Sequence, residues 1–228
     1  MMYKFSMSKI EFNILGHACR FMRAKDNLYN MKHSTIFSFS TENVGNGKAY
    51  RKEICMKTLE TERLILREWQ ESDAPDMFKL GKSPNVVNAG WKIHKNIDES
   101  LECIRMSIKY QESWAIVLKE NSKPIGWISL SDINRHDSYR EMEYVISEDY
   151  QNKGYATEAV KCVLKYAFSE LDLMIVAVCH YPFNIRSKRV IEKCGFTYEG
   201  TLRKYSRNLN DSVRYSMMKE EWESLYRK

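Results

Sequence analysis

Hydrophobic and polar positions follow regular periods from Met56 onward, but not before it. Residues 1–55 mix apolar, polar and basic residues without a sustained helical or strand period. From Met56 the chain alternates short apolar runs with segments whose apolar residues recur every three or four positions. We therefore divide it into an N-terminal extension, 1–55, and one patterned domain, 56–228. The extension is either poorly ordered sequence upstream of a natural start at Met56, or an accessory arm that packs on the domain or a partner.

The periods in 56–228 predict a mixture of strands and helices. Strands are expected at residues 63–69, 114–118, 125–130, 139–146, 174–178 and 213–218. Helices are expected after Ser72-Asp73, at 97–112, at 156–168, and from Asn184 to a stop at Gly195. This order of elements predicts a mixed α/β or α+β domain.

The most informative segment joins the strand that ends at Ile146 to the helix that begins near Ala156. Gly154 lies at the junction, where the first backbone N–H groups of the helix have no intrahelical partner. Together with the helix dipole, these N–H groups can bind a pyrophosphate, and glycine lets the backbone approach the anion closely. A plain tight turn is the alternative, because strand–glycine–helix junctions are common.

Three short motifs occur in a fixed order around this junction. They are Gln-x-x-Gly-x-Ala from Gln151, Asn-x-x-Ser from Asn184, and Gly-Phe at Gly195. In that order and spacing the sequence resembles the GNAT superfamily of N-acetyltransferases, and within it the RimJ/RimL branch, whose best-known members acetylate N-terminal amines of ribosomal proteins. The resemblance covers nearly all of 56–228 and none of 1–55. It implies a splayed, mixed central sheet flanked by helices, with acetyl-CoA as cosubstrate.

The resemblance also implies where the cosubstrate binds. The pantetheine arm would pair with the backbone of one strand, and the pyrophosphate would lie in the turn that follows that strand. The implied cofactor-binding residues are Tyr144, Val145, Ile146, Asn152, Lys153, Gly154, Tyr155, Ala156, Thr157 and Asn184.

Candidate catalytic residues follow from the chemistry of acetyl transfer to an amine. Only a neutral amine attacks the thioester, and Glu141 is the candidate base because related enzymes often carry a glutamate at the start of the cofactor strand. Glu143 on the same face is its rival, and an exposed strand glutamate without a catalytic role is the alternative for both. Many relatives carry a tyrosine seven residues after Asn184, but this chain has Ile191 there. Ser187 is therefore the candidate donor of a hydrogen bond to the leaving sulfur, unless it only packs within its helix.

The acceptor follows from the same chemistry. At pH 7 an N-terminal amine is roughly 10% neutral and a lysine about 0.04% neutral, a difference of roughly 3 kcal/mol. A weak base therefore suffices for an α-amine, and we expect a protein or peptide N-terminus, possible examples being ribosomal proteins. A small amine such as a polyamine, an aminoglycoside or an amino-acid-like metabolite is the alternative. A binding adaptor that holds acetyl-CoA without turnover is the second alternative.

Charge and composition narrow the remaining classes of function. The net charge of +6 comes largely from residues 1–55, which hold nine Lys/Arg against four acids, so nucleic-acid binding by the domain is not expected. The six cysteines form no CxxC pair and predict neither a metal site nor a disulfide framework. No apolar run approaches the roughly 20 residues of a membrane span. We expect a cytoplasmic protein, either a monomer or a homodimer.

Overall fold

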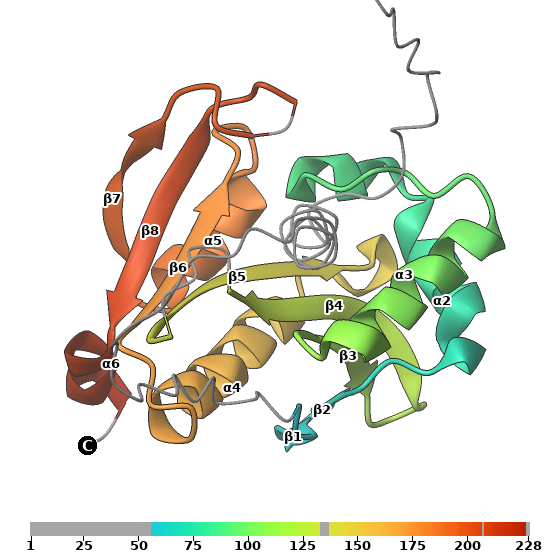
Figure 1. Cartoon of the computed structure of the whole chain (residues 1–228), viewed down its shortest axis with the longest axis horizontal. Helices are drawn as coiled ribbons and strands as arrows, with labels where there is room; N and C mark the ends of the chain where they lie inside the picture. The colour runs from blue at the N-terminus through green and yellow to red at the C-terminus, as the bar shows by residue number, and fades with distance from the viewer. Residues whose placement is uncertain (1–55, 133–136, 207, 227–228) are drawn as a thin grey trace, which may run out of the picture.

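A single eight-stranded sheet with helices on both faces forms the domain (Figure 1). The computed structural model of the protein describes residues 56–132, 137–206 and 208–226. The strands are β1 (Leu59–Glu60), β2 (Leu64–Arg67), β3 (Ser113–Leu118), β4 (Lys123–Ser131), β5 (Tyr139–Ile146), β6 (Ile175–His180), β7 (Thr197–Leu202) and β8 (Ser212–Met218). The helices are α2 (Ala74–Gly81), α3 (Ile97–Tyr110), α4 (Tyr155–Ser169), α5 (Ile185–Lys193) and α6 (Lys219–Tyr226). Short 3-10 turns lie at Glu71–Asp73, Pro84–Ala89 and Glu148–Tyr150.

Two hydrophobic cores cover the two faces of the sheet. In β3, Trp114 and Ile116 belong to the core shared with α4, whereas Ala115 and Val117 belong to the core under α2 and α3. Successive side chains of a strand point to opposite faces, so a strand covered on both sides is apolar throughout. All of β3 is accordingly buried, which explains its continuous apolar run.

The sheet splits between β5 and β6. Its strand order is β1-β2-β3-β4-β5-β6-β8-β7, and β5–β6 is the parallel pair among antiparallel neighbours. The parallel pairing runs only from Tyr139–Ile175 to Met142–Val178. Beyond it, β5 stays with β4 while β6 stays with β8, so the two strands diverge at their carboxyl ends. The predicted splayed, mixed sheet flanked by helices is confirmed.

The predicted elements agree with the structure apart from their ends, but the predicted strands do not include β1 or β7. β6 runs on to His180, and β4 begins earlier than predicted because Lys123 and Pro124 already pair with β3. The sequence pattern does not predict α6, where Trp222 is the one buried residue and no apolar stripe forms. Residues 1–55 lie outside the described residues, so the boundary at Met56 stays a prediction.

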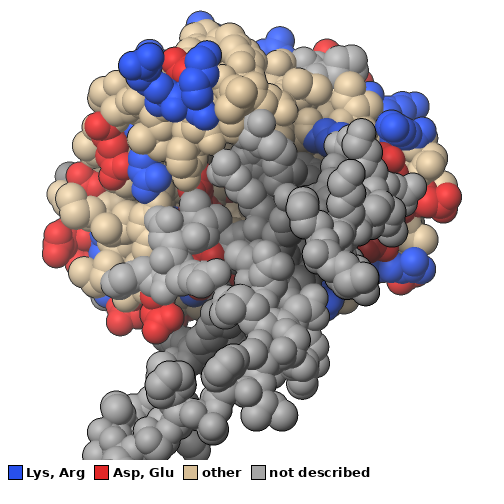
Figure 2. Space-filling model, turned by 45° about the horizontal axis from the view of Figure 1, so that its top comes forward, with Lys and Arg blue, Asp and Glu red and all other residues tan. Residues whose placement is uncertain are grey.

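Charged side chains of both signs are interspersed on the face of the described region that Figure 2 shows. No single-sign field dominates that face, in agreement with the nearly balanced charge of residues 56–228. Among the described helices, none is both long and apolar enough to cross a bilayer.

Candidate active site

A cavity of about 410 Å³ lies in the fork between β5 and β6. The diverging ends of the two strands form its centre, together with the first turn of α4 and one face of α5. On the opposite face of the sheet its wall includes the end of α3 and alternate residues of β4. The fold therefore brings segments from distant parts of the sequence around one opening in the sheet.

The backbone of β5 faces this opening beyond Met142. The N–H group of Ser147 donates to the carbonyl of Ile125 at 2.8 Å, so odd-numbered residues here direct their backbone groups toward β4. Backbone groups alternate in direction along a strand, and those of Tyr144 and Ile146 therefore point into the fork. The Gln151 side chain confirms this direction, because its Nε2 donates to the carbonyl of Ile146 at 2.9 Å.

The turn before α4 has the backbone shape that anion binding requires. Gly154 caps the helix with a φ of 83°, a left-handed conformation that disfavours other residues, and Asn152 has a φ of 61°. The first helical hydrogen bond joins the N–H of Glu158 to the carbonyl of Gly154. The N–H groups of the three residues between them are thus available at the positive end of the helix dipole. Arg186 adds a guanidinium at this end, held by the Gln151 side-chain oxygen at 2.6 Å.

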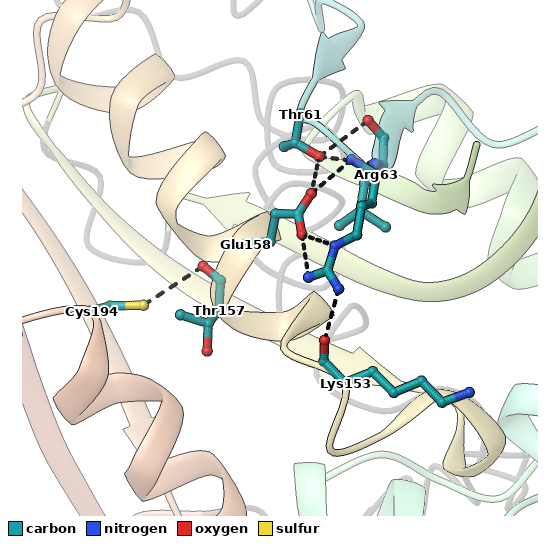
Figure 3. Close-up of polar contacts among 7 residues, drawn as sticks. Thr61, Arg63, Lys153, Thr157, Glu158 and Cys194 are labelled. Atoms are coloured by element: carbon teal, nitrogen blue, oxygen red, sulfur yellow. Dashed lines mark hydrogen bonds and ion pairs between the residues drawn. The ribbon is translucent and has the colours of Figure 1, made fainter. Parts of the chain in front are cut away.

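A polar network attaches this turn to the start of the sheet (Figure 3). The Glu158 carboxylate accepts hydrogen bonds from Thr61 Oγ1 at 2.5 Å, from Arg63 N at 3.0 Å and from Arg63 Nε at 2.7 Å. Arg63 Nη1 then donates to the carbonyl of Lys153 at 3.0 Å, inside the turn itself. The guanidinium also lies 4.6 Å from the ring centroid of Tyr155. This network fixes the entry of the chain into α4.

Polar side chains line the fork on the α3 side of the sheet. Glu141 and Glu143 stand opposite Ser131 and Ser129 in the β4–β5 register, so all four share one face. Glu141 is 8% exposed, whereas Glu143 is half-buried, and both line the cavity. A carboxylate at this depth can accept a proton or a hydrogen bond from an amine that enters from the α3 side.

Hydroxyl groups line the fork on the α5 side. Ser187 lies one turn into α5, and its Oγ is 2.9 Å from the phenol oxygen of Tyr144. Asn184 caps the same helix by accepting from the Ser187 N–H at 3.1 Å, as its sequence position predicts. Ile191 is fully buried in the core, so α5 directs no phenol toward the fork at that position.

The structure brings most of the residues expected at the site into one place. Those that line the cavity are Glu141, Ser187, Tyr144, Val145, Ile146, Asn152, Gly154, Tyr155, Ala156, Thr157 and Asn184. Lys153 does not line it: its side chain is exposed, with Nζ 5.4 Å from the ring centroid of Tyr150. Asn184 uses its amide within the protein, since Nδ2 donates to the carbonyl of Asn88 at 2.8 Å.

The sequence pattern does not predict that the serines of β4 and two residues of α3 line the cavity. Trp127, Ser129 and Ser131 line it from β4, and Met106 and Tyr110 line it from α3. The sequence of β4 does contain a signal for a polar site: Ser129 and Ser131 alternate with Ile128 and Leu130 in a strand that is mostly buried. Buried polar residues at alternate positions of a strand indicate a polar site on one face.

Cys179 and Cys194 are poor nucleophiles. Burial, reinforced by the nearby Glu141 carboxylate, raises the pKa of Cys179, and burial raises the pKa of Cys194 to about 11. Neither thiol forms thiolate at neutral pH, so a thiolate nucleophile is not expected in this cavity. Within the described residues, no group of three or more His, Cys, Asp or Glu side chains is arranged to hold a metal ion.

Comparison with known proteins agrees with this geometry. The sequence profile of the acetyltransferase (GNAT) domain matches residues 63–197. The chain is 30% identical over 177 residues to YnaD of Bacillus subtilis (strain 168), called an uncharacterized N-acetyltransferase, covering 71% of this chain and 97% of the relative. A ribosomal-protein-S5-alanine acetyltransferase of Vibrio fischeri superposes with a TM-score of 0.60 at 22% identity, covering 73% of this chain and 98% of the other. A spermidine N-acetyltransferase of Vibrio cholerae in complex with CoA and spermine superposes with a TM-score of 0.61 at 22% identity, covering 71% and 99%.

Proposed function

This chain belongs to the GNAT family of N-acetyltransferases, and we propose that it transfers the acetyl group of acetyl-CoA to the free α-amine of a peptide or protein. The observation that carries the proposal is the fork between β5 and β6. One end of it has a turn whose backbone N–H groups can accept an anion, and the other has two carboxylates beside a cavity. These two ends suit the two substrates of the reaction, a nucleotide cosubstrate and an amine.

The residues of the fork fit acetyl-CoA in this proposal. The turn from Asn152 to Thr157 would hold the pyrophosphate on backbone N–H groups, with Arg186 beside it. The backbone groups of Tyr144 that face the fork would pair with the amides of the pantetheine arm. The thioester would then lie between the strand ends, and the backbone N–H near Ile146 would stabilise the oxyanion.

Glu141 is the proposed general base, and Glu143 is its rival on the same face. The α-amine is favoured as acceptor because its pKa near 8 leaves roughly 10% of it neutral at pH 7, so a weak carboxylate base is sufficient. On the leaving-group side, we expect the Ser187 hydroxyl, which lines the cavity, to help stabilise the departing sulfur.

A small polyamine is the second candidate acceptor, and a specific observation favours it. Glu112, Glu141 and Glu143 all line the cavity, and several carboxylates around one site attract a polycation. The solved structures of a ribosomal-protein acetyltransferase and of a spermidine acetyltransferase are both 22% identical to this chain, so they support the fold for either acceptor equally.

A thiol-release assay separates these candidates. The purified chain is given acetyl-CoA with Ala-, Ser- or Met-starting peptides, with the same peptides blocked at the N-terminus, and with polyamines and aminoglycosides. The proposal predicts turnover on free peptides that blocking abolishes. Turnover on polyamines alone would replace the peptide acceptor by a small amine. Binding of CoA without release of thiol from any amine would instead identify a non-catalytic acetyl-CoA adaptor.

A further inference from the structure

The two faces of β5 carry opposite kinds of chemistry at the fork. Glu143 and Tyr144 are neighbours in the strand, so their side chains point to opposite faces of the sheet. Glu143 shares its face with Val145, which packs in the core under α2 and α3. Tyr144 packs on the other side, against the core shared with α4. Both residues line the same cavity, which therefore has carboxylates on one side and a phenol on the other.

The phenol of Tyr144 is held by Ser187 from the opposite wall. Its oxygen lies 3.2 Å from the backbone carbonyl of Ser187 and 2.9 Å from the Ser187 hydroxyl. A carbonyl can only accept, so the phenol proton points toward α5, while the Ser187 hydroxyl can donate to the phenol oxygen. When a stronger acceptor enters the cavity, the serine bond can remain while the phenol proton turns toward that acceptor.

Burial raises the pKa of Tyr144, opposed in part by the hydrogen bond from Ser187. The phenol is therefore fully protonated at neutral pH and available as a proton donor. The conjugate thiol of an alkyl thiolate has a pKa of about 8.5, below that of the phenol, so the proton transfer is uphill and has to be coupled to the departure of the sulfur, and a more acidic phenol would favour it. One turn further along α5, Ile191 is buried and apolar and cannot donate a proton. The phenol of Tyr144, on β5, supplies the proton donor instead.

We propose that Tyr144 is the catalytic acid that protonates the departing sulfur, and that Ser187 is a positioning residue that orients its phenol. This assignment rests on the proposed acetyl transfer. The amine would approach from the carboxylate face of β5, and the sulfur would leave toward the phenol face. The acyl carbon would lie between them, in the gap where β5 and β6 part.

Protons and electrons balance in this step. The nitrogen lone pair forms the N–C bond, and the C–S bond breaks with its electron pair remaining on sulfur. The phenol proton of Tyr144 passes to that sulfur, giving free CoA thiol. The carboxylate on the opposite face receives the proton that the nitrogen loses, and exchange with solvent restores both groups.

The variant Tyr144→Phe tests the assignment, with Ser187→Ala as its companion and Tyr198→Phe as the matched control. Tyr198 is 57% exposed on β7 and does not line the cavity, so its variant removes one phenol without touching the site. With full-length protein we expect Tyr144→Phe to lower the single-turnover rate about 100-fold, the low end of general-acid effects, because a thiolate leaves readily. The dissociation constant for CoA should stay within about twofold of the wild type, and Tyr198→Phe should react normally.

Two further measurements distinguish an acid from a packing residue. Because Ser187 acts through Tyr144, the double variant should react no more slowly than Tyr144→Phe alone. Ser187→Ala alone should lower the single-turnover rate by less than Tyr144→Phe does. Replacing Tyr144 by 3-fluoro- and 3,5-difluorotyrosine keeps its shape while making the phenol more acidic, and the single-turnover rate should rise with that acidity.

An unchanged rate in Tyr144→Phe would overturn the assignment. So would equal losses of rate and CoA affinity, or a rate that is indifferent to fluorination. Absence of turnover by the wild-type protein on every amine would instead overturn the proposed acetyl transfer. The wild-type protein is therefore assayed first, before the variants.

Discussion

Glu141 and Glu143 differ in burial although they share one face of β5. Glu141 is 8% exposed and stands opposite Ser131, whereas Glu143 is half-buried opposite Ser129. A deeper carboxylate is less screened by water and acts more strongly on an amine in the same cavity. The geometry thus favours Glu141 as the base, although both carboxylates can contact a ligand there.

Replacing each glutamate by its uncharged isostere separates the two. Glu141→Gln should lower kcat about 100-fold on a peptide acceptor, in the range typical of a lost general base, while the KM for acetyl-CoA stays unchanged. Glu143→Gln should lower it by less than about tenfold, within the range of an electrostatic neighbour. Initial rates with each variant check this, and a larger loss in Glu143→Gln would transfer the role of base to that residue.

Predictability from sequence differs sharply among single residues. The Asn184 cap and the left-handed Gly154 follow from local chemistry, and the structure contains both. The hydrogen bond between Tyr144 and Ser187 joins residues 43 positions apart in the sequence, and no local sequence pattern predicts a contact over that separation. Likewise the serines of β4 belong to the site only through their register with β5.

At the scale of elements, α4 depends on its attachment to the β1–β2 corner. Burial alone would raise the pKa of Glu158, but hydrogen bonds from Thr61 and Arg63 outweigh it, and the net effect lowers that pKa. A carboxyl with a lowered pKa in the folded state stabilises the protein above its unfolded pKa. That stabilisation is lost as the pH falls through the lowered value. The network in Figure 3 is therefore intact at neutral pH and weakens only in acid.

Breaking this network should affect the nucleotide end of the site and leave the acceptor end alone. Glu158→Gln keeps the shape of the side chain but removes the ion pair with Arg63, and we expect it to raise the KM for acetyl-CoA several-fold with little change in kcat. S-acetylpantetheine lacks the pyrophosphate, so its kcat/KM should be equal in variant and wild type. Equal losses with both donors would show that the network supports the whole fork and not the phosphate-binding turn.

Elements with strong periodicity are predictable here, and their ends and weak members are not. The range of β5 and the core of α4 follow from alternation and from the three- and four-residue spacing. α6 is buried mainly through Trp222, and its contact with β8 is a tertiary effect that its own polar sequence does not encode. A periodic spacing of apolar residues arises when one face of an element packs against the core. An element that contacts the core through a single residue therefore shows almost no periodicity in its sequence.

On the scale of the whole molecule, the candidate site lies where the sheet fails to pair. β5 and β6 hydrogen-bond only from Tyr139–Ile175 to Met142–Val178, and the fork beyond that pairing collects residues from β4, α3, α4 and α5. The motif order identifies the family and hence the splayed sheet, but the lining of the rest of the cavity depends on side-chain geometry across several strands. The motifs therefore lead to a specific proposal for the cosubstrate end of the candidate site, whereas the acceptor end has to be read from the structure.

The most direct test of the account places two amines in one substrate. A peptide with a free N-terminus and one internal lysine is incubated with the full-length protein and acetyl-CoA, and tandem mass spectrometry locates the added acetyl group. We expect acetylation at the α-amine, because its neutral form at pH 7 is about 200-fold more abundant than that of a lysine. Acetylation at the lysine, or of an added polyamine in preference to the peptide, would contradict it.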